Sequence, residues 1–115
     1  RVNLGWALAH HGRGTEALVQ LERARREQPD NAEAELKTGL VHAMSGRVAD
    51  AAPHLRRAVA LQPDRADLRH ILGTALLDLG RPAEAAAEFE EALRLAPGHR
   101  DARQGLEQAR RMGAR

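Results

Sequence analysis

The sequence of 115 residues is long enough for one domain with a hydrophobic core, and it is too short for an enzyme domain together with a regulatory domain. Its 18 basic and 16 acidic side chains leave a formal charge of +2, which does not call for a polyanionic partner, so we predict no nucleic-acid binding. The sequence contains no cysteine, which excludes disulfides, thiol nucleophiles and cysteine-containing zinc sites.

The sequence also lacks the apolar segments that target a chain to a membrane. No apolar run approaches the ~18 residues of a membrane-spanning helix, and no charged leader precedes an apolar segment. We therefore expect a soluble protein without membrane insertion, in the cytoplasm in preference to the periplasm. The chain starts at Arg1, without a methionine and inside a predicted helix, so we expect it to be a piece of a longer protein.

The composition favours helices over strands. Apolar residues make up 43% of the chain but aromatic residues only 2%, and Trp6 and Phe89 are the only large rings. Strands are typically rich in aromatic and β-branched side chains, whereas alanine-rich segments pack as helices at close range. The predicted fold class is therefore all-α, with no strand.

Residues recur along the chain with a period of 34. Pro29, Pro63 and Pro97 have this spacing. Five further columns repeat in the same way: Gly5, Gly39 and Gly73; Gly12, Gly46 and Gly80; Ala17, Ala51 and Ala85; Ala24, Ala58 and Ala92; Leu21, Leu55 and Phe89. We interpret residues 1–115 as a single repeat domain, with repeats at 1–31 (truncated at its N-terminus), 32–65 and 66–99 and a remainder at 100–115.

Each repeat is predicted to contain two helices. The predicted helices, in chain order, lie near 2–11, 15–28, 32–45, 50–62, 66–79, 82–95 and 100–112. Gly46 suits the left-handed position just after a helix, and Pro63 stops the helix before it. Asp30 and the acid three residues later, Glu33, suggest a capping box. Pro53 is compatible with a helix only if that helix starts late, near Asp50, and otherwise predicts a bend or fraying.

The small residues indicate where the two helices of a repeat meet. A glycine inside a helix costs about 1 kcal/mol relative to alanine. Gly39 and Gly73 are therefore expected where another backbone passes close by. Ala17 and Ala24 lie seven residues apart and form one face of the second helix together with Leu21. Because one hairpin cannot bury both of its faces, we expect the repeats to stack.

This pattern resembles the tetratricopeptide repeat. In the third repeat the resemblance is carried by Leu72-Gly73-x2-Leu76, by Ala85-x3-Phe89, and by Ala92 and Pro97, and the first repeat has the equivalent residues. The second repeat departs from the pattern at Thr38 and His42, and Arg1, Glu35 and Arg69 replace the opening tryptophan. We expect His42 to take the packing place of the family's tyrosine and His54 to face solvent.

The resemblance implies a fold and a function. It implies a right-handed α-solenoid of three helix-turn-helix repeats, with a C-terminal capping helix at 100–112. The first helices would form a concave wall that holds a peptide or helix of a partner protein, without catalysis and without cofactors. Some family members grip a peptide's C-terminal carboxylate with a lysine, asparagine and arginine set. Only Asn3 and Lys37 remain of such a set here, which argues against chaperone tails held by their C-terminal carboxylate as ligands.

The residues also suggest which side chains line this groove. Leu36, Leu40 and Met44 recur every four residues, on the side of their helix opposite to the face predicted to pack in the hairpin. We predict an apolar trough that grades into a polar wall in the third repeat. The candidate groove residues are Val2, Trp6, His10, Leu36, Lys37, Leu40, Met44, His70, Ile71, Thr74 and Asp78.

Other interpretations remain open. The apolar stripe could complete internal packing, or it could pair two copies of the chain into a homo-oligomer that serves assembly. The domain could also dock substrates for an enzyme domain outside this sequence. Six histidines are present, but their spacing matches no metal-binding motif, and no serine has a plausible base beside it, so we predict neither a metal site nor catalytic residues.

Overall fold

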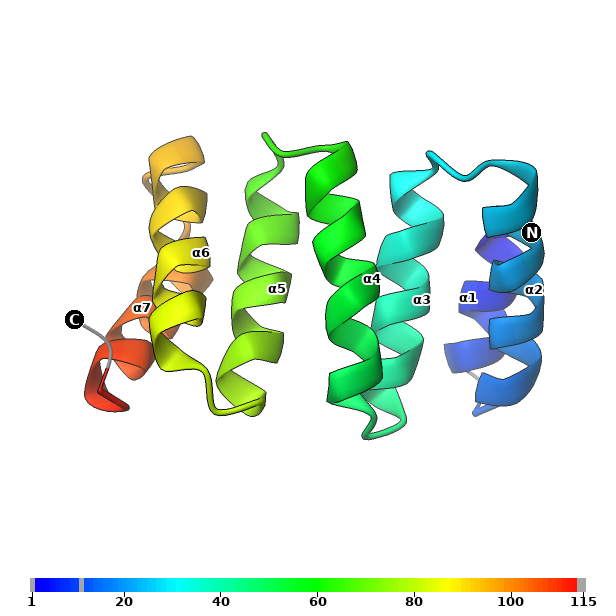
Figure 1. Ribbon diagram of the computed structural model, residues 1–115, viewed down its shortest axis with the longest axis horizontal. Coiled ribbons are helices and arrows are strands. Elements are labelled where there is room, and N and C mark those ends of the chain that lie inside the picture. Colours follow the sequence, from blue (N-terminus) through cyan, green and yellow to red (C-terminus); the bar gives the residue numbers. More distant parts are fainter. Residues whose placement is uncertain (1, 11, 114–115) are drawn as a thin grey trace. The chain divides into compact units, whose positions relative to one another are not determined.

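The protein is built from helices that follow one another in hairpins. A computed structural model describes residues 2–10 and 12–113, except for the side chain of His10. These residues form seven helices and no strand, which confirms the all-α prediction. The helices are α1 (Val2–His10), α2 (Gly14–Glu27), α3 (Ala32–Met44), α4 (Val48–Leu61), α5 (Ala66–Asp78), α6 (Pro82–Leu95) and α7 (Arg100–Arg111) (Figure 1). No helix of the described part of the chain is long and apolar enough to cross a membrane.

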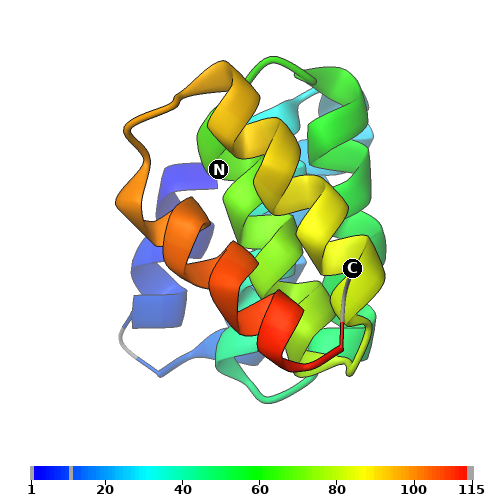
Figure 2. The ribbon, with the colours of Figure 1, turned by 90° about the vertical axis from the view of Figure 1, so that its left-hand side faces the viewer.

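The chain divides into two compact units. Unit 1 is Arg1–Leu61 and unit 2 is Gln62–Arg115. In unit 1, α1 packs against α2 and α3 against α4, and α3 also contacts α1 and α2. In unit 2, α6 packs against both α5 and α7, and α5 contacts α7; Figure 2 shows α6 and α7 side by side. The prediction that 1–115 is a single repeat domain stays a prediction.

The start of α4 differs from the sequence prediction. The helix begins at Val48, before the expected Asp50, so Pro53 lies inside it. Because Gly46 ends the preceding turn at φ +78°, the next helix can start almost at once, and the N–H of Ala51 already donates to the Arg47 carbonyl at 3.0 Å. The prediction of a late start is therefore wrong, and Pro53 leaves one helical hydrogen bond unmade.

The N-terminal cap of α3 also differs. Asn31 is the N-cap, and its side chain accepts a hydrogen bond from the N–H of Ala34 at 3.2 Å. The predicted capping role of Asp30 is wrong, because the helix begins at Ala32 and the residue directly before it takes the cap. Asparagine is among the best N-cap residues, so the local chemistry is that of an ordinary cap.

The repeated glycines lie where the first helix of a hairpin approaches the second. A Cβ on Gly39 would be 2.8 Å from side-chain atoms of Leu55 and 3.3 Å from the carbonyl oxygen of Ala51. A Cβ on Gly73 would be 2.8 Å from the ring of Phe89. The nearest neighbour of each glycine is thus a large side chain of the second helix. At Gly39 the backbone of the second helix is also close, through the carbonyl oxygen of Ala51. Leu55 and Phe89 are buried in these contacts.

We predict that Gly73→Ala destabilises unit 2. Alanine favours a helix over glycine by about 1 kcal/mol. Overpacking a core costs about 1–3 kcal/mol, and the buried ring of Phe89 has little room to move away. The free energy of unfolding should therefore fall by about 1 kcal/mol, as measured by urea denaturation followed by circular dichroism.

Gly98→Ala is the matched control in the same unit. A Cβ at Gly98 meets nothing within 4 Å, and its backbone is outside the left-handed region. This variant should change the free energy of unfolding by less than about 0.5 kcal/mol. Equal stability of the two variants would contradict the packing role of Gly73.

Candidate functional site

The first helices of successive repeats lie next to one another within each unit. In unit 1 α1 contacts α3, and in unit 2 α5 contacts α7. The predicted groove residues divide between three of these helices: Val2, Trp6 and His10 on α1; Leu36, Lys37, Leu40 and Met44 on α3; His70, Ile71, Thr74 and Asp78 on α5. The side chain of His10 is outside the described residues, and nothing further is stated of it.

Trp6 and Lys37 come together in unit 1. The Nζ atom of Lys37 lies 4.2 Å from the centroid of the Trp6 ring, within the range of a cation–π interaction. Trp6 and Val2 are half-buried and pack against a core cluster that includes Ala9 and Val41. Trp6 is therefore half-buried, with the core cluster on its flank and the Lys37 cation near its ring.

The apolar stripe on α3 becomes more exposed toward the end of the helix. Leu36 is 5% exposed, Leu40 is half-buried and Met44 is 55% exposed. Leu36 therefore belongs to the interior, and Leu40 and Met44 present apolar surface to solvent. Met44 also lines a depression of about 380 Å³ in unit 1, together with Ala9, Gly12, Gly14, Val41 and Ser45. We name the surface formed by Trp6, Lys37, Leu40 and Met44 the unit 1 surface.

Unit 2 contains a polar pocket between α5 and α7, here called the α5–α7 pocket. Its volume is about 210 Å³. The pocket brings together three of the predicted residues, His70, Thr74 and Asp78, whereas Ile71 is half-buried and does not line it. Its other lining residues are Leu77, Phe89, Asp101, Gln104, Gly105 and Gln108.

The sequence analysis missed the α7 side of this pocket. Gln104 and Gln108 stand 34 residues after His70 and Thr74, at the same positions of the repeat. The period therefore contained the signal: Ala102 and Leu106 resemble the start of a further first helix, but the capping helix predicted at 100–112 was given no groove residues. In the structure α7 does cover α6, and it also supplies a wall equivalent to that of a further first helix.

The electrostatics of the α5–α7 pocket are set by His70 and its neighbours. The His70 ring lies 5.1 Å from the His99 ring and 5.9 Å from the Phe89 ring. Burial and then the neighbouring His99 lower the pKa of His70, against a smaller opposing effect of Asp101. His70 is therefore a neutral hydrogen-bonding group at neutral pH.

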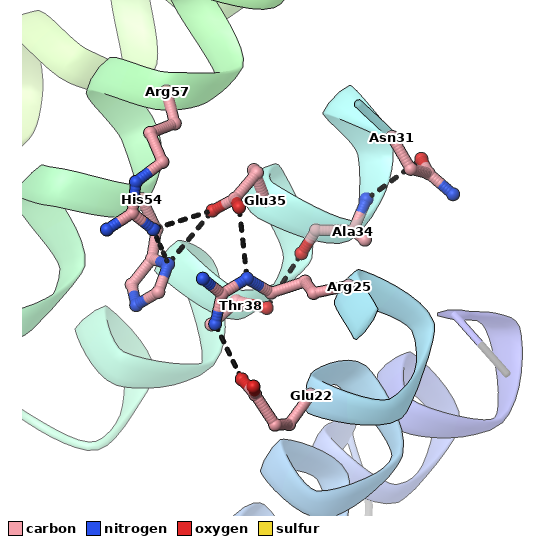
Figure 3. A network of polar contacts seen from close by, with 8 residues as sticks. All are labelled: Glu22, Arg25, Asn31, Ala34, Glu35, Thr38, His54 and Arg57. Carbon is pink, nitrogen blue, oxygen red and sulfur yellow. Dashed lines mark hydrogen bonds and ion pairs between the residues drawn. The ribbon is translucent and has the colours of Figure 1, made fainter. Parts of the chain in front are cut away.

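A second polar cluster surrounds Glu35 in unit 1 (Figure 3). Glu35 is 4% exposed, and its carboxylate pairs with Arg25 Nε of α2 at 3.0 Å and with His54 Nδ1 of α4 at 2.9 Å. Arg57 Nη1 approaches it at 3.5 Å, and Glu22 binds Arg25 from the solvent side. The expectation that His54 faces solvent is wrong, because this carboxylate holds it half-buried.

Glu35 connects three helices through a satisfied network. Burial acts to raise the pKa of its carboxyl, but the hydrogen bonds from His54 and Arg25 together outweigh burial and hold the pKa below its ordinary value of 4.5. In unit 2, Arg69 and Glu88 stand 34 positions after Glu35 and His54, and they form an ion pair at 3.0 Å. A charged side chain thus occupies the place of the family's tryptophan in both repeats: Glu35 pairs with Arg25 and His54, and Arg69 pairs with Glu88. We therefore assign this cluster to packing between helices.

The described residues offer no centre for metal chemistry. No group of three or more His, Asp or Glu side chains in the described part of the chain is arranged to hold a metal ion. His42 is half-buried and its ring stacks on His54 at 5.6 Å, which fits the packing place predicted for it. Burial, followed by the charges of His54 and Arg47, lowers the pKa of His42.

Comparison with known proteins gives one family. The family model described as tetratricopeptide repeat matches residues 2–66, 45–100 and 70–111. No curated protein matches this sequence.

Several solved structures have the same fold. A crystal structure of MamA is 25% identical, with a TM-score of 0.89, and the match covers 96% of this chain and 64% of MamA. TTC0263, a thermophilic TPR protein of Thermus thermophilus, is 35% identical, with a TM-score of 0.74 over 86% of this chain and 50% of its own. The second TPR domain of human RPAP3, solved with an HSP70 peptide, is 22% identical, with a TM-score of 0.87 over 94% and 90%. The chain thus spans about two thirds or less of the first two proteins.

We predict that Glu35→Gln destabilises the protein at neutral pH. The amide cannot accept hydrogen bonds from both Arg25 and His54, and one donor is left unpaired where the site is buried. The free energy of unfolding should fall by about 2 kcal/mol in urea denaturation. Glu22→Gln is the control, because Glu22 binds the same Arg25 but is 51% exposed, and it should cost less than about 1 kcal/mol.

The contribution of Glu35 should also depend on pH. Because its folded-state pKa is lowered, the unfolded chain binds more protons, and the stabilisation is complete above the ordinary value of 4.5. It is lost as the pH falls through the folded-state pKa. The stability difference between the wild type and Glu35→Gln should therefore shrink on acidification below 4.5, and a constant difference would contradict the role of the ionised carboxylate.

Proposed function

We propose that this chain, which belongs to the tetratricopeptide repeat family, is a non-catalytic scaffold that binds a peptide or helix of a partner protein. The contacts of the partner would be with the first helices, α1, α3, α5 and α7. The family model matches nearly the whole chain, and this family's repeats are interaction modules. The human RPAP3 domain named above, solved with a bound peptide, has the same fold.

The observation that carries the proposal is the unit 1 surface. Met44 is 55% exposed although it continues the apolar stripe of α3, and Trp6 is half-buried beside Lys37. An apolar side chain of a partner could bury this area without displacing the core. Aromatic and methionine side chains at a surface are typical of interaction sites.

The energies indicate a modest affinity for this surface alone. Trp6 and Leu40 are already half-buried, so the three apolar anchors Trp6, Leu40 and Met44 would contribute about 1–2 kcal/mol each. Association costs at least about 4 kcal/mol in lost freedom. Polar contacts elsewhere on the first helices must therefore add to the affinity for a short peptide.

We predict that Met44→Glu abolishes most peptide binding. Peptides would be selected from a displayed random library against the wild-type chain, and their binding would be followed by the emission of Trp6, the only tryptophan. The charge would have to be desolvated against the apolar anchor of the peptide, so affinity should fall at least about tenfold.

Val19→Glu is the matched control. Val19 is 53% exposed, nearly the same as Met44, but it lies on the second helix α2. This variant should bind the selected peptides like the wild type. If both variants bind equally well, the unit 1 surface is not the binding site.

The main competing function is self-association. Leu4 on α1 is 51% exposed, so α1 also offers apolar surface that a second copy could cover. Light scattering of the chain over a range of concentrations separates the two functions. A dimer that forms with increasing concentration and is lost in Met44→Glu would favour assembly over peptide binding.

A further inference from the structure

The α5–α7 pocket carries an inference about the chemistry of the partner. Several of its polar side chains make no polar contact with the rest of the protein: within the described residues, no hydrogen bond or ion pair engages the side chains of Asp78, Gln104 or Gln108. The hydroxyl of Thr74 donates to the carbonyl of His70 at 3.1 Å, which leaves its oxygen able to accept. The pocket thus presents an array of hydrogen-bond acceptors and amides to solvent.

The pocket is lined by residues of α5 and α7, together with Phe89 of α6. At one end the His70 ring lies 5.1 Å from the ring of His99, which is the N-cap of α7. Farther along, Gly73 of α5 and Gly105 of α7 both adjoin the Phe89 ring. The two helices therefore run in the same direction, with Asp101 near the His70 end and Asp78 near the other. Asp78 lies eight helical steps after His70 in α5, which is about 12 Å along the helix axis.

The charge of the pocket has one sign. Asp78 and Asp101 line it, and no Lys or Arg does. Burial and the neighbouring His99 lower the pKa of His70, so the imidazole does not offset these carboxylates at neutral pH. These carboxylates would repel an acidic peptide, whereas cationic side chains could pair with Asp101 and with Asp78.

The floor of the pocket is apolar. It is formed by the buried side chains of Phe89 and Leu77 and by the bare backbone of Gly105. The long side chains of Lys and Arg bury their methylene stems on such a surface while their charged ends remain in water. Gln104 and Gln108 can both donate to and accept from a peptide backbone.

We propose that the α5–α7 pocket binds an extended basic segment of the partner, with one Arg or Lys side chain at Asp101 and a second at Asp78. An extended chain rises about 3.4 Å per residue, so basic residues four positions apart span about 14 Å, close to the separation of about 12 Å between His70 and Asp78 along α5. This inference rests on the proposed scaffold function and specifies its ligand. Acidic peptide tails are thereby disfavoured on charge.

The test uses the isotope-labelled full chain and nuclear magnetic resonance. The probe is the blocked peptide acetyl-Gly-Arg-Gly-Ala-Gly-Arg-Gly-amide, and the comparison peptides carry Gln or Glu in place of both Arg residues. The Arg peptide should cause saturable shifts of the backbone amides of Thr74, Asp78, Gln104 and Gln108. The Gln and Glu peptides should bind at least about fivefold more weakly.

Two double variants separate a specific site from general attraction. Asp78→Asn with Asp101→Asn should weaken binding of the Arg peptide about five- to tenfold. Glu90→Gln with Glu107→Gln removes the same charge from exposed positions of α6 and α7 outside the pocket, and it should bind within about twofold of the wild type. The amide spectrum of each variant reports directly whether the fold is kept.

Three outcomes would overturn the inference. The Arg and Gln peptides could bind equally, the Asn variant could bind like the wild type, or both double variants could lose binding to the same extent. Failure here is distinguishable from failure of the scaffold function, because that function is read from Trp6 and Met44 in unit 1. Library-selected peptides without basic residues that require Met44 would leave the scaffold function standing and overturn only this inference.

Discussion

The contact between a glycine of the first helix and a large side chain of the second sets the geometry of the hairpins. Gly39 faces Leu55, and Gly73 faces Phe89, at distances that leave no room for a Cβ. Because this contact fixes which face of the first helix is buried in the hairpin, it also fixes which face is left over. The stripe from Leu36 to Met44 and the row from His70 to Asp78 lie on that remaining face, and both candidate surfaces follow from it.

Polar contacts supplement this apolar packing at one repeated position. Glu35 with His54, and Arg69 with Glu88, are separated by the same number of residues and lie 34 positions apart. The acid is on the first helix in one repeat and on the second helix in the other.

The two units present different chemistry at equivalent positions of the repeat. Leu40 and Met44 in unit 1 correspond to Thr74 and Asp78 in unit 2, so an apolar surface in one has a polar, acidic counterpart in the other. Lys37 is the only cation in the unit 1 surface, and it is engaged with Trp6. The two proposals therefore call for different chemistry in the ligand, an apolar side chain at unit 1 and basic side chains at unit 2.

The sequence alone determined the repeat, the helices and their approximate ends, because a period of 34 and the Gly and Pro positions are local features. It also placed His70, Thr74 and Asp78 on one helix face. Only the tertiary structure showed that Leu36 is buried while Met44 is exposed, and that His54 contacts Glu35. It also showed that α7 contributes Asp101, Gln104 and Gln108 to the α5–α7 pocket. These outcomes depend on how closely neighbouring helices approach, and helical periodicity gives the direction of a side chain but not its distance from the next helix.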